Sequence, residues 1–410
     1  MHFVDFVYLF SFLVMIYSSV LWLSVLLDHG DRIKKREKPK KWPSITFLIP
    51  AYNEERHIAK CIESLLNLDY PKKPKIIVIN DGSTDRTGEI ARRYEKYGVR
   101  VVDKVNEGKK AKALNYALKN LKIDTELVAC MDADSFPERD FLKKIVPHLT
   151  RAHAVTPAMK VANPKTVMEK IQWVEYCFSI FLRKLFAIFD CQYVLPGPGS
   201  VYRRDVLKKI GYFDENNLTE DMELAFRMID NGYRIENAID AYVYTDCPKT
   251  FRELFRQRIR WYRGYFQNVK KYFHMVLNPK YGNLGVFLLP VNFIWLFIVI
   301  FFFVYPIYRF IFDSIHTLFL WMRGGIYLQQ PSFNFNFSIL HLNFFMFFWT
   351  FLFFVNILNI YLSVKYSGEK LELWKKKSFY IPFFILYPLL IGFFYLVSII
   401  YELLGVRRKW

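Results

Sequence analysis

Four apolar stretches, each long enough to cross a bilayer, constrain this chain more than any other feature. They span residues 3–27, 284–308, 338–364 and 379–401. About 20 predominantly apolar residues suffice for a membrane-spanning helix, and these runs exceed the usual length of a buried core helix. A cleaved signal peptide fits the first run poorly, because no basic segment precedes it. We therefore expect one transmembrane helix within 1–30 and about three within 284–401.

Basic residues beside these runs predict the orientation of the chain in the membrane. A basic tract at 32–41 follows the first run, and three lysines at 375–377 lie between the last two. Basic loops stay in the cytoplasm, so the N-terminus is expected outside and the region between the first two spans inside. The basic residues at 407–409 do not fit this rule, since four spans would place them outside the cell. A crossing or re-entry by 309–337 would change the number of spans.

The net charge of +19 indicates anionic partners. Much of the basic excess lies beside the predicted spans, where membrane lipids account for it. Nucleic acid is not expected as a partner, because no zinc-finger or ribonucleoprotein motif is present. The five cysteines form no C-x-x-C pair, which fits reduced thiols rather than a disulfide framework or a zinc site. We expect a multi-pass protein of the cell membrane with a cytoplasmic central domain.

Residues 42–250 have the pattern of a soluble α/β domain. Short apolar runs alternate with amphipathic helical patterns, which predicts a mostly parallel sheet covered by helices on both faces. Ligands of such sheets bind beyond the carboxyl ends of the strands. Residues 251–280 mix basic and aromatic side chains and predict a helix lying in the membrane interface, with a solvated basic face as the alternative. The expected strands are 45–49, 75–79, 99–104, 127–131, 153–156 and 241–245, and the expected helices are 54–66, 84–97, 111–121 and 138–150.

Polar residues follow the first two expected strands. The string Ala51-Tyr52-Asn53-Glu54-Glu55 follows the first, and Asp81-Gly82-Ser83-Thr84-Asp85 follows the second. Simple helix capping would explain the Asn, Ser, Thr and Asp residues. The alternative is a nucleotide pocket, in which Asp81 hydrogen-bonds a base or a ribose.

Two carboxylates, Asp132 and Asp134, follow the strand at 127–131. Hard oxygen ligands suit Mg²⁺ or Mn²⁺, so a divalent metal is the expected cofactor. A D-x-D string arises by chance about once in a chain of this composition. Its position at the end of a strand gives it weight.

Further motifs lie along the rest of the domain. Lys110 stands where a helix is expected to start, a good position for binding phosphate, and Gly199 and Ser200 belong to a turn that lets a ligand approach the backbone. Glu220 and Asp221 precede a helical stretch. They are either N-terminal charges that stabilise the helix or, for Asp221, a general base.

The string Gln257-Arg258-Ile259-Arg260-Trp261 is the most specific of the motifs. Its first, fourth and fifth residues share one face of a helix. The face combines an amide, a fixed cation and a flat indole ring, which suits a diphosphate and a sugar ring. A purely structural stripe remains the alternative.

Taken in order, I-P-A-Y-N-E-E, N-D-G-S-T-D, G-K-K-A-K-A-L-N, D-A-D-S, G-P-G-S, T-E-D and Q-R-I-R-W resemble family 2 glycosyltransferases. The resemblance covers about residues 44–265 and is strongest to the membrane-embedded branch, which includes hyaluronan, chitin and cellulose synthases, nodulation chitin-oligosaccharide synthases and ceramide glucosyltransferases. It implies a GT-A fold and inverting transfer from a nucleotide-diphosphate sugar. It also implies that Asp221 is the catalytic base and that Asp134 binds the metal. The residues implied to bind the nucleotide sugar are Ala51, Tyr52, Glu54, Asp81, Lys110 and Asp132. Those implied to bind the diphosphate and the acceptor are Gly199, Ser200, Glu220, Gln257, Arg260 and Trp261.

We therefore expect a membrane-bound, metal-dependent glycosyltransferase that extends a β-linked polysaccharide, with UDP as the nucleotide that the resemblance implies. Transfer of one sugar to a lipid acceptor is an alternative that uses the same site. A non-catalytic membrane scaffold is a third, opposed by the complete set of acidic residues. Four spans are few for a polymer channel in one chain, which favours either lipid transfer or a homo-oligomer.

Overall fold

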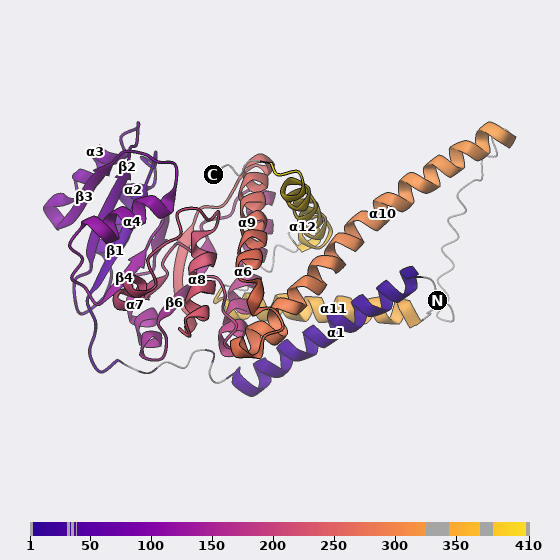
Figure 1. The fold of residues 1–410 in the computed structure, drawn as a ribbon, viewed down its shortest axis with the longest axis horizontal. Coiled ribbons are helices and arrows are strands. Elements are labelled where there is room, and N and C mark those ends of the chain that lie inside the picture. The colour runs from indigo at the N-terminus through magenta and orange to yellow at the C-terminus, as the bar shows by residue number, and fades with distance from the viewer. Residues whose placement is uncertain are drawn as a thin grey trace.

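The computed structural model describes residues 3–30, 33, 37, 39–324, 344–369 and 380–406 (Figure 1). Its centre is an eight-stranded mixed sheet with the order β3-β2-β1-β4-β7-β6-β8-β5. Four of the seven strand pairings are parallel and three are antiparallel. This is the Rossmann-like arrangement of a GT-A domain, as predicted. The strands are β1 (Ile45–Ala51), β2 (Lys75–Asp81), β3 (Val99–Lys104), β4 (Leu127–Cys130), β5 (Ser135–Pro137), β6 (Ala154–Val161), β7 (Val201–Arg203) and β8 (Ile235–Thr245).

Helices cover both faces of the sheet. Helix α2 (Ile58–Leu66) buries Ile58, Cys61, Ile62 and Leu65, one stripe at helical spacing. Together with α5 (Phe141–Ile145) it forms one core with the strands. The opposite core contains α4 (Lys110–Asn120), α7 (Arg204–Lys209) and α8 (Glu220–Asp230). Since both faces are covered, β1 and β4 are almost continuously apolar and buried.

The observed elements differ from the predicted ones in the division of two helices and in two short strands that were not predicted. The helix expected at 84–97 is divided into α3 (Thr87–Arg92) and a 3₁₀ turn at Glu95–Tyr97. The helix expected at 138–150 is likewise divided into α5 and a 3₁₀ turn that contains Pro147, a residue that cannot donate to a helical ladder. Strands β5 and β7 have three residues each, too few for a period-2 pattern to predict them. All five cysteines are free and buried.

Two long helices, α6 (Val167–Ile188) and α9 (Phe251–Lys271), lie between the sheet and the apolar helices (Figure 1). Each begins with a capping box, formed by Thr166 with Glu169 and by Thr250 with Glu253. Helix α9 packs through Leu254 and Ile259 against α12 (Tyr380–Leu403). The basic-aromatic segment predicted at 251–280 is thus a helix only as far as Lys271, with one face against a candidate membrane span, and 3₁₀ turns follow at Phe273–Met275 and Pro279–Tyr281.

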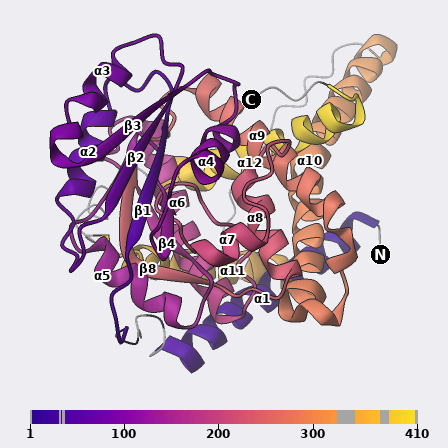
Figure 2. The same ribbon diagram turned by 60° about the vertical axis from the view of Figure 1, so that its left-hand side comes forward.

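Within the described residues, three helical segments are long and apolar enough to cross a membrane: Phe3–His29, Leu284–Arg323 and Leu386–Leu403. The run expected at 338–364 corresponds to α11 (Phe344–Tyr366), and 338–343 lie outside the described part. Figure 2 shows α10 and α12 on the side of the molecule opposite β2 and β3.

Helix α10 (Leu289–Gly324), with the π turn at Leu284–Leu288, does not end at residue 308 as expected. The aromatic segment from 309 to 324 continues the same helix. The basic residues at 375–377 and 407–409, and most of the tract at 32–38, lie outside the described residues. The orientation inferred from them therefore stays a prediction.

Candidate active site

The structure gathers most of the predicted site residues around one cavity of about 750 Å³. The cavity lies beyond the end of β4, between the first turns of α4 and α8 and the middle of α9. The sequence-predicted residues that line it are Lys110, Asp132, Asp134, Glu220, Asp221, Gln257, Arg260 and Trp261.

Asp132 and Asp134 stand on the turn that leaves β4. The turn is closed by a hydrogen bond from the Ser135 backbone N–H to the Asp132 carbonyl at 3.0 Å, and the Ser135 hydroxyl donates to Asp134 Oδ1 at 2.9 Å. Burial, with the added negative charge of Asp132, raises the pKa of Asp134 to about 6. A divalent cation would relieve this concentration of negative charge, so the two carboxylates fit a metal. No group of three or more His, Cys, Asp or Glu with metal-ligand geometry occurs in the described part of the chain, so such a metal would need further oxygen ligands from outside these side chains.

Lys110, the first residue of α4, forms an ion pair with Asp132. Burial alone would lower the pKa of Lys110, but the charges of Asp132 and Glu220 raise it above its ordinary value. The ammonium therefore stays charged. Gly197 faces it closely, and a Cβ at that position would overlap the Lys110 Nζ. The predicted turn thus contributes a glycine that the sequence analysis did not single out.

Gly199 and Ser200, at the end of the turn at 196–200, do not line the cavity. Gly199 has φ +80° and its N–H donates to the Cys130 carbonyl at 2.7 Å. The Ser200 hydroxyl is fully buried and donates to the Pro196 carbonyl at 2.5 Å. Both residues fix the turn that carries Gly197.

Glu220 and Asp221 open helix α8 behind Thr219. Asp221 Oδ1 accepts the backbone N–H of Met222 at 2.8 Å, and burial raises the pKa of Glu220. Asn268 on α9 donates to the Thr219 hydroxyl at 3.0 Å. A Cβ at Gly264 would overlap the Thr219 side chain. Close packing of α9 therefore sets the position of the segment that carries Asp221.

Helix α9 supplies the basic and aromatic side of the cavity. Arg260 Nη1 donates to the Leu218 carbonyl at 3.2 Å. The buried Gln257 Oε1 has no hydrogen-bond partner among the residues the structure describes. Arg258 lies with its guanidinium 4.3 Å from the centre of the Trp261 ring and donates to Glu175 Oε2 at 2.7 Å. Sequence analysis missed this last contact.

The four remaining predicted residues lie at the ends of β1 and β2 or just after β1, and they do not line this cavity. Ala51 is buried at the end of β1, and Tyr52 is half exposed. Glu54 Oε2 is 2.8 Å from His57 Nδ1. Asp81 is buried and accepts a hydrogen bond from Lys104 Nζ at 3.3 Å. These residues lie at the same end of the sheet, where β1 and β2 terminate, since Ala51 pairs with Asn80 in the β1–β2 register.

The far wall of the cavity comes from α6 and the apolar helices, a contribution that the sequence analysis did not foresee. Asn292, Trp295, Leu296 and Val299 come from α10, and Ile391 and Tyr395 from α12. The ring of Tyr395 stacks on Tyr262 of α9 with centroids 4.0 Å apart. The cavity therefore extends from the acidic residues at the sheet to two candidate membrane spans.

Comparison with known proteins identifies the domain. Residues 43–264 match the family model described as glycosyltransferase like family 2. The chain belongs to glycosyltransferase family 2. Over 311 residues it is 27% identical to the poly-β-1,6-N-acetyl-D-glucosamine synthase of Staphylococcus aureus strain COL, covering 73% of this chain and 75% of that one. It is 29% identical over 398 residues to the probable glycosyltransferase YdaM of Bacillus subtilis strain 168, covering 92% and 88%.

The GT-A fold is also found in a solved structure, the mannosyltransferase PcManGT of Pyrobaculum calidifontis in complex with GDP-Man and Mn²⁺. The TM-score is 0.58 at 18% sequence identity, and the match covers 97% of this chain and 99% of that one. The family and the fold predicted from the motifs are confirmed.

Proposed function

We propose that this glycosyltransferase extends a β-linked polysaccharide by inverting transfer from a UDP-sugar at the cytoplasmic face of a membrane. The observation that carries the proposal is the shared cavity. It holds the predicted base Asp221, the carboxylates Asp132 and Asp134 and the Arg260–Trp261 face, and it extends to α10 and α12. UDP-N-acetylglucosamine is the proposed donor, supported by the name of the staphylococcal relative.

Asp221 is proposed to act on the acceptor. Its carboxylate would accept the proton of the attacking hydroxyl as that oxygen bonds to the anomeric carbon. The departing nucleoside diphosphate leaves from the opposite face in the same displacement, so an α-linked donor gives a β-linkage. The Met222 N–H that donates to Asp221 Oδ1 holds one oxygen, which leaves Oδ2 for the acceptor.

The leaving diphosphate gains negative charge in the transition state, and cations already in place stabilise it. Arg260, oriented by the Leu218 carbonyl, and Lys110, oriented by Asp132, are proposed to bind the phosphates. Mg²⁺ or Mn²⁺ held by Asp134 and Asp132 would supply further positive charge beside these oxygens. Trp261 would offer its ring to the acceptor sugar, and the Arg258 guanidinium, 4.3 Å from the ring centre, would hold the ring in place.

The domain boundaries predicted from the sequence fit this proposal. Residues 42–250 would form the cytoplasmic catalytic domain and 251–280 the interfacial segment. The spans at 1–30 and 284–401 would anchor both in a multi-pass arrangement. Because four spans are few for a polymer channel, we propose that the growing chain leaves along the cavity between α10 and α12 of a homo-oligomer.

Transfer of one sugar to a lipid is the second candidate, and one observation favours it. Leu296, Val299 and Ile391 bring apolar side chains of two candidate spans into the wall of the cavity. An acceptor with a hydrocarbon tail would find matching contacts there.

Product length separates the two candidates. Purified full-length protein in lipid nanodiscs is incubated with radiolabelled UDP-N-acetylglucosamine and Mn²⁺, and the products are resolved on a gel and by lipid extraction. A ladder of polymers supports the polysaccharide synthase, whereas a single lipid-extractable product supports the second candidate. A parallel panel of UDP- and GDP-sugars, scored by nucleotide release, tests the donor; turnover of GDP-sugars alone would overturn the proposed nucleotide.

A further inference from the structure

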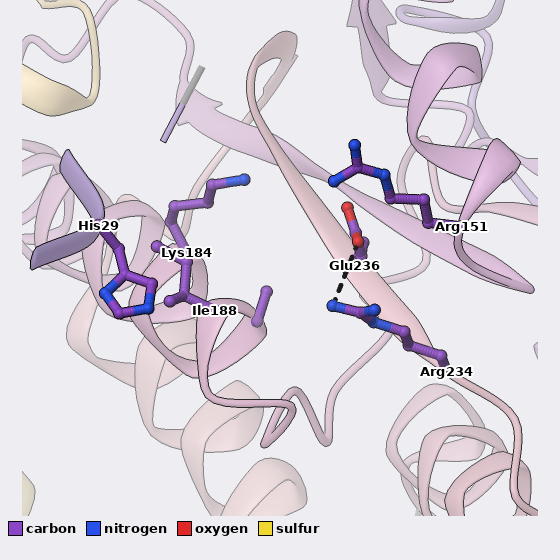
Figure 3. A pocket seen from close by; sticks show the side chains of 7 residues that line it. His29, Arg151, Lys184, Ile188, Arg234 and Glu236 are labelled. Atoms are coloured by element: carbon purple, nitrogen blue, oxygen red, sulfur yellow. Dashed lines mark ion pairs between the residues drawn. The ribbon is translucent and has the colours of Figure 1, made fainter. Parts of the chain in front are cut away.

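A second cavity, of about 290 Å³, lies away from the catalytic one, where α1 (Phe3–His29), the end of α6 and the start of β8 meet. Figure 3 shows His29 and Lys184 on one side of it and Arg151, Arg234 and Glu236 on the other. Two arginines and a lysine thus surround one carboxylate. Nothing in the proposed transfer reaction uses this cavity.

Lys184 is the most unusual member of this group. Its side chain is only 5% exposed, and its Nζ donates to the Asn237 carbonyl at 3.0 Å. Among the described residues, no carboxylate lies within 4.0 Å of that Nζ, which contrasts with Lys160, equally buried but 3.0 Å from Glu369. Burial lowers the pKa of Lys184 and so disfavours its charged form. A bound anion would supply the missing partner.

The carboxylate in the cavity is already engaged. Glu236 Oε2 is 3.0 Å from His148 Nδ1, and Glu236 Oε1 is 3.6 Å from Arg234 Nη2. The charges of Glu236 and Asp240 act on Lys184 only from beyond ion-pair distance, and burial still lowers the pKa of Lys184. On the opposite side, His29 Nδ1 is buried without a hydrogen-bond partner in the described part of the chain. His29 Nδ1 thus lacks the hydrogen-bond partner that burial normally requires, and Lys184 has a carbonyl but no carboxylate at ion-pair distance.

The two arginines are available to a ligand as well. Arg151 pairs with Glu37, and Arg234 pairs with Asp190 at 2.9 Å. All four side chains are 45–61% exposed. Ion pairs of this exposure contribute little and exchange readily. A phosphate in the cavity would compete for both guanidinium groups, which suit phosphate oxygens in a bidentate geometry.

The position of the cavity indicates where that phosphate comes from. The candidate membrane span α1 ends at His29, which lines the cavity. Trp22 packs edge-on against Phe186 of α6, with ring centroids 5.4 Å apart, and fixes the end of α1 against the domain. Phospholipid phosphates lie at the ends of membrane spans, beside the hydrocarbon core.

We propose that this cavity, defined by His29, Arg151, Lys184 and Arg234, binds the phosphate of a phospholipid headgroup and holds the catalytic domain against the membrane. The same chemistry would suit a soluble phosphate, so the test must separate the two sources. The proposal does not depend on the sugar or acceptor of the transferase.

The test measures binding to purified full-length protein in dodecyl maltoside by calorimetry. Three probes are compared: dihexanoyl phosphatidylglycerol, dihexanoylglycerol, which has the same chains without phosphate, and inorganic phosphate. We expect saturable binding of the phosphatidylglycerol only. Equal binding of dihexanoylglycerol would overturn the phosphate site, and equal binding of inorganic phosphate would overturn the lipid source.

Variants localise the binding. Lys184→Gln with Arg234→Gln should weaken phosphatidylglycerol binding about 30-fold, from the effect expected of two basic residues near a lipid surface. Arg100→Gln with Lys122→Gln, two exposed positions that remove the same charge, should bind like the unaltered protein. If the first pair fails to fold, Arg151→Gln on the exposed rim is the substitute and should weaken binding about fivefold. Unchanged binding in the folded variants would overturn the proposal.

Discussion

Arg258 on α9 donates a hydrogen bond to Glu175 on α6 at 2.7 Å, and this pair joins the two helices that separate the sheet from the candidate spans. Both side chains are largely buried, with 3% and 18% exposure. Arg258 also lies against the ring of Trp261. One buried ion pair thus couples the packing of the cavity wall to the aromatic surface proposed for the acceptor.

Arg258→Gln should therefore destabilise the protein and lower its activity together. Removing one partner of a buried pair leaves an uncompensated charge, which costs about 3–5 kcal/mol. Thermal unfolding in detergent measures the loss. Arg256→Gln, an exposed position on the same helix, is the matched control and should unfold like the unaltered protein. Replacing both Arg258 and Glu175 by Met should restore much of the stability; failure to recover would show that the pair is not the cause.

Asp221→Asn should strongly slow transfer while leaving donor binding intact. The amide cannot accept the acceptor proton, and loss of a general base lowers turnover by about 10²- to 10⁴-fold. Turnover is followed by nucleotide release, and donor binding by calorimetry. Asp205→Asn on the exposed face of α7 controls for the loss of one charge. Wild-type turnover in the Asp221 variant would remove this residue from the proposed reaction.

The fold was largely predictable because its signals are local. The apolar strands and the i, i+3, i+4, i+7 stripe of α2 follow from sequence spacing alone. The position of Asp132 and Asp134 followed from the rule that ligands of parallel sheets bind at the carboxyl ends of strands. Strands β5 and β7, with three residues each, gave no such signal.

The parts of the site that escaped prediction depend on contacts between distant segments. Lys104 pairs with Asp81 from the neighbouring strand β3, and Glu175 reaches Arg258 across 83 positions. Which glycine of the 196–200 turn faces Lys110 depends on the path of the loop, and it is Gly197 rather than Gly199. To predict the wall of the cavity formed by α10 and α12, one must know how these helices pack against α9, and no sequence motif specifies that packing.

Gly264→Ala should lower turnover through Thr219 rather than through any direct contact with substrate. The added methyl group would overlap the Thr219 side chain and displace the start of α8. Overpacking of this kind costs about 1–3 kcal/mol, and a shift of a catalytic group costs about 10- to 100-fold in kcat. Gly30→Ala meets nothing within 4 Å and serves as the control. Adding Thr219→Ala to the Gly264 variant should recover part of the activity, whereas purely additive losses would contradict the packing explanation.

Removal of divalent metal should stop the reaction, and substitution of Asp134 should change how the activity depends on metal concentration. Treatment with EDTA is expected to abolish nucleotide release, and Mn²⁺ or Mg²⁺ to restore it. Asp134→Asn should raise the metal concentration needed for half-maximal activity by about tenfold or more, because it removes an anionic oxygen ligand. Asp124→Asn, in an exposed pair with Lys75, should leave that concentration unchanged. Full activity in EDTA would contradict a metal-dependent transfer.

Acid should destabilise the domain through Glu236. Burial alone would raise the pKa of this carboxyl, but the hydrogen bond with His148 and the nearby cations lower it below its ordinary value of 4.5. A lowered pKa in the folded state contributes stability above about pH 4.5, and the contribution is lost as the pH falls through the folded-state pKa. Glu236→Gln lacks this contribution. Its melting temperature should lie below that of the unaltered protein at about pH 6, and the difference should shrink towards about pH 3. For the control Glu95→Gln, at an exposed position, the difference in melting temperature should be small and should not change with pH. The same behaviour of Glu236→Gln would exclude the Glu236 carboxyl as the acid-sensitive group.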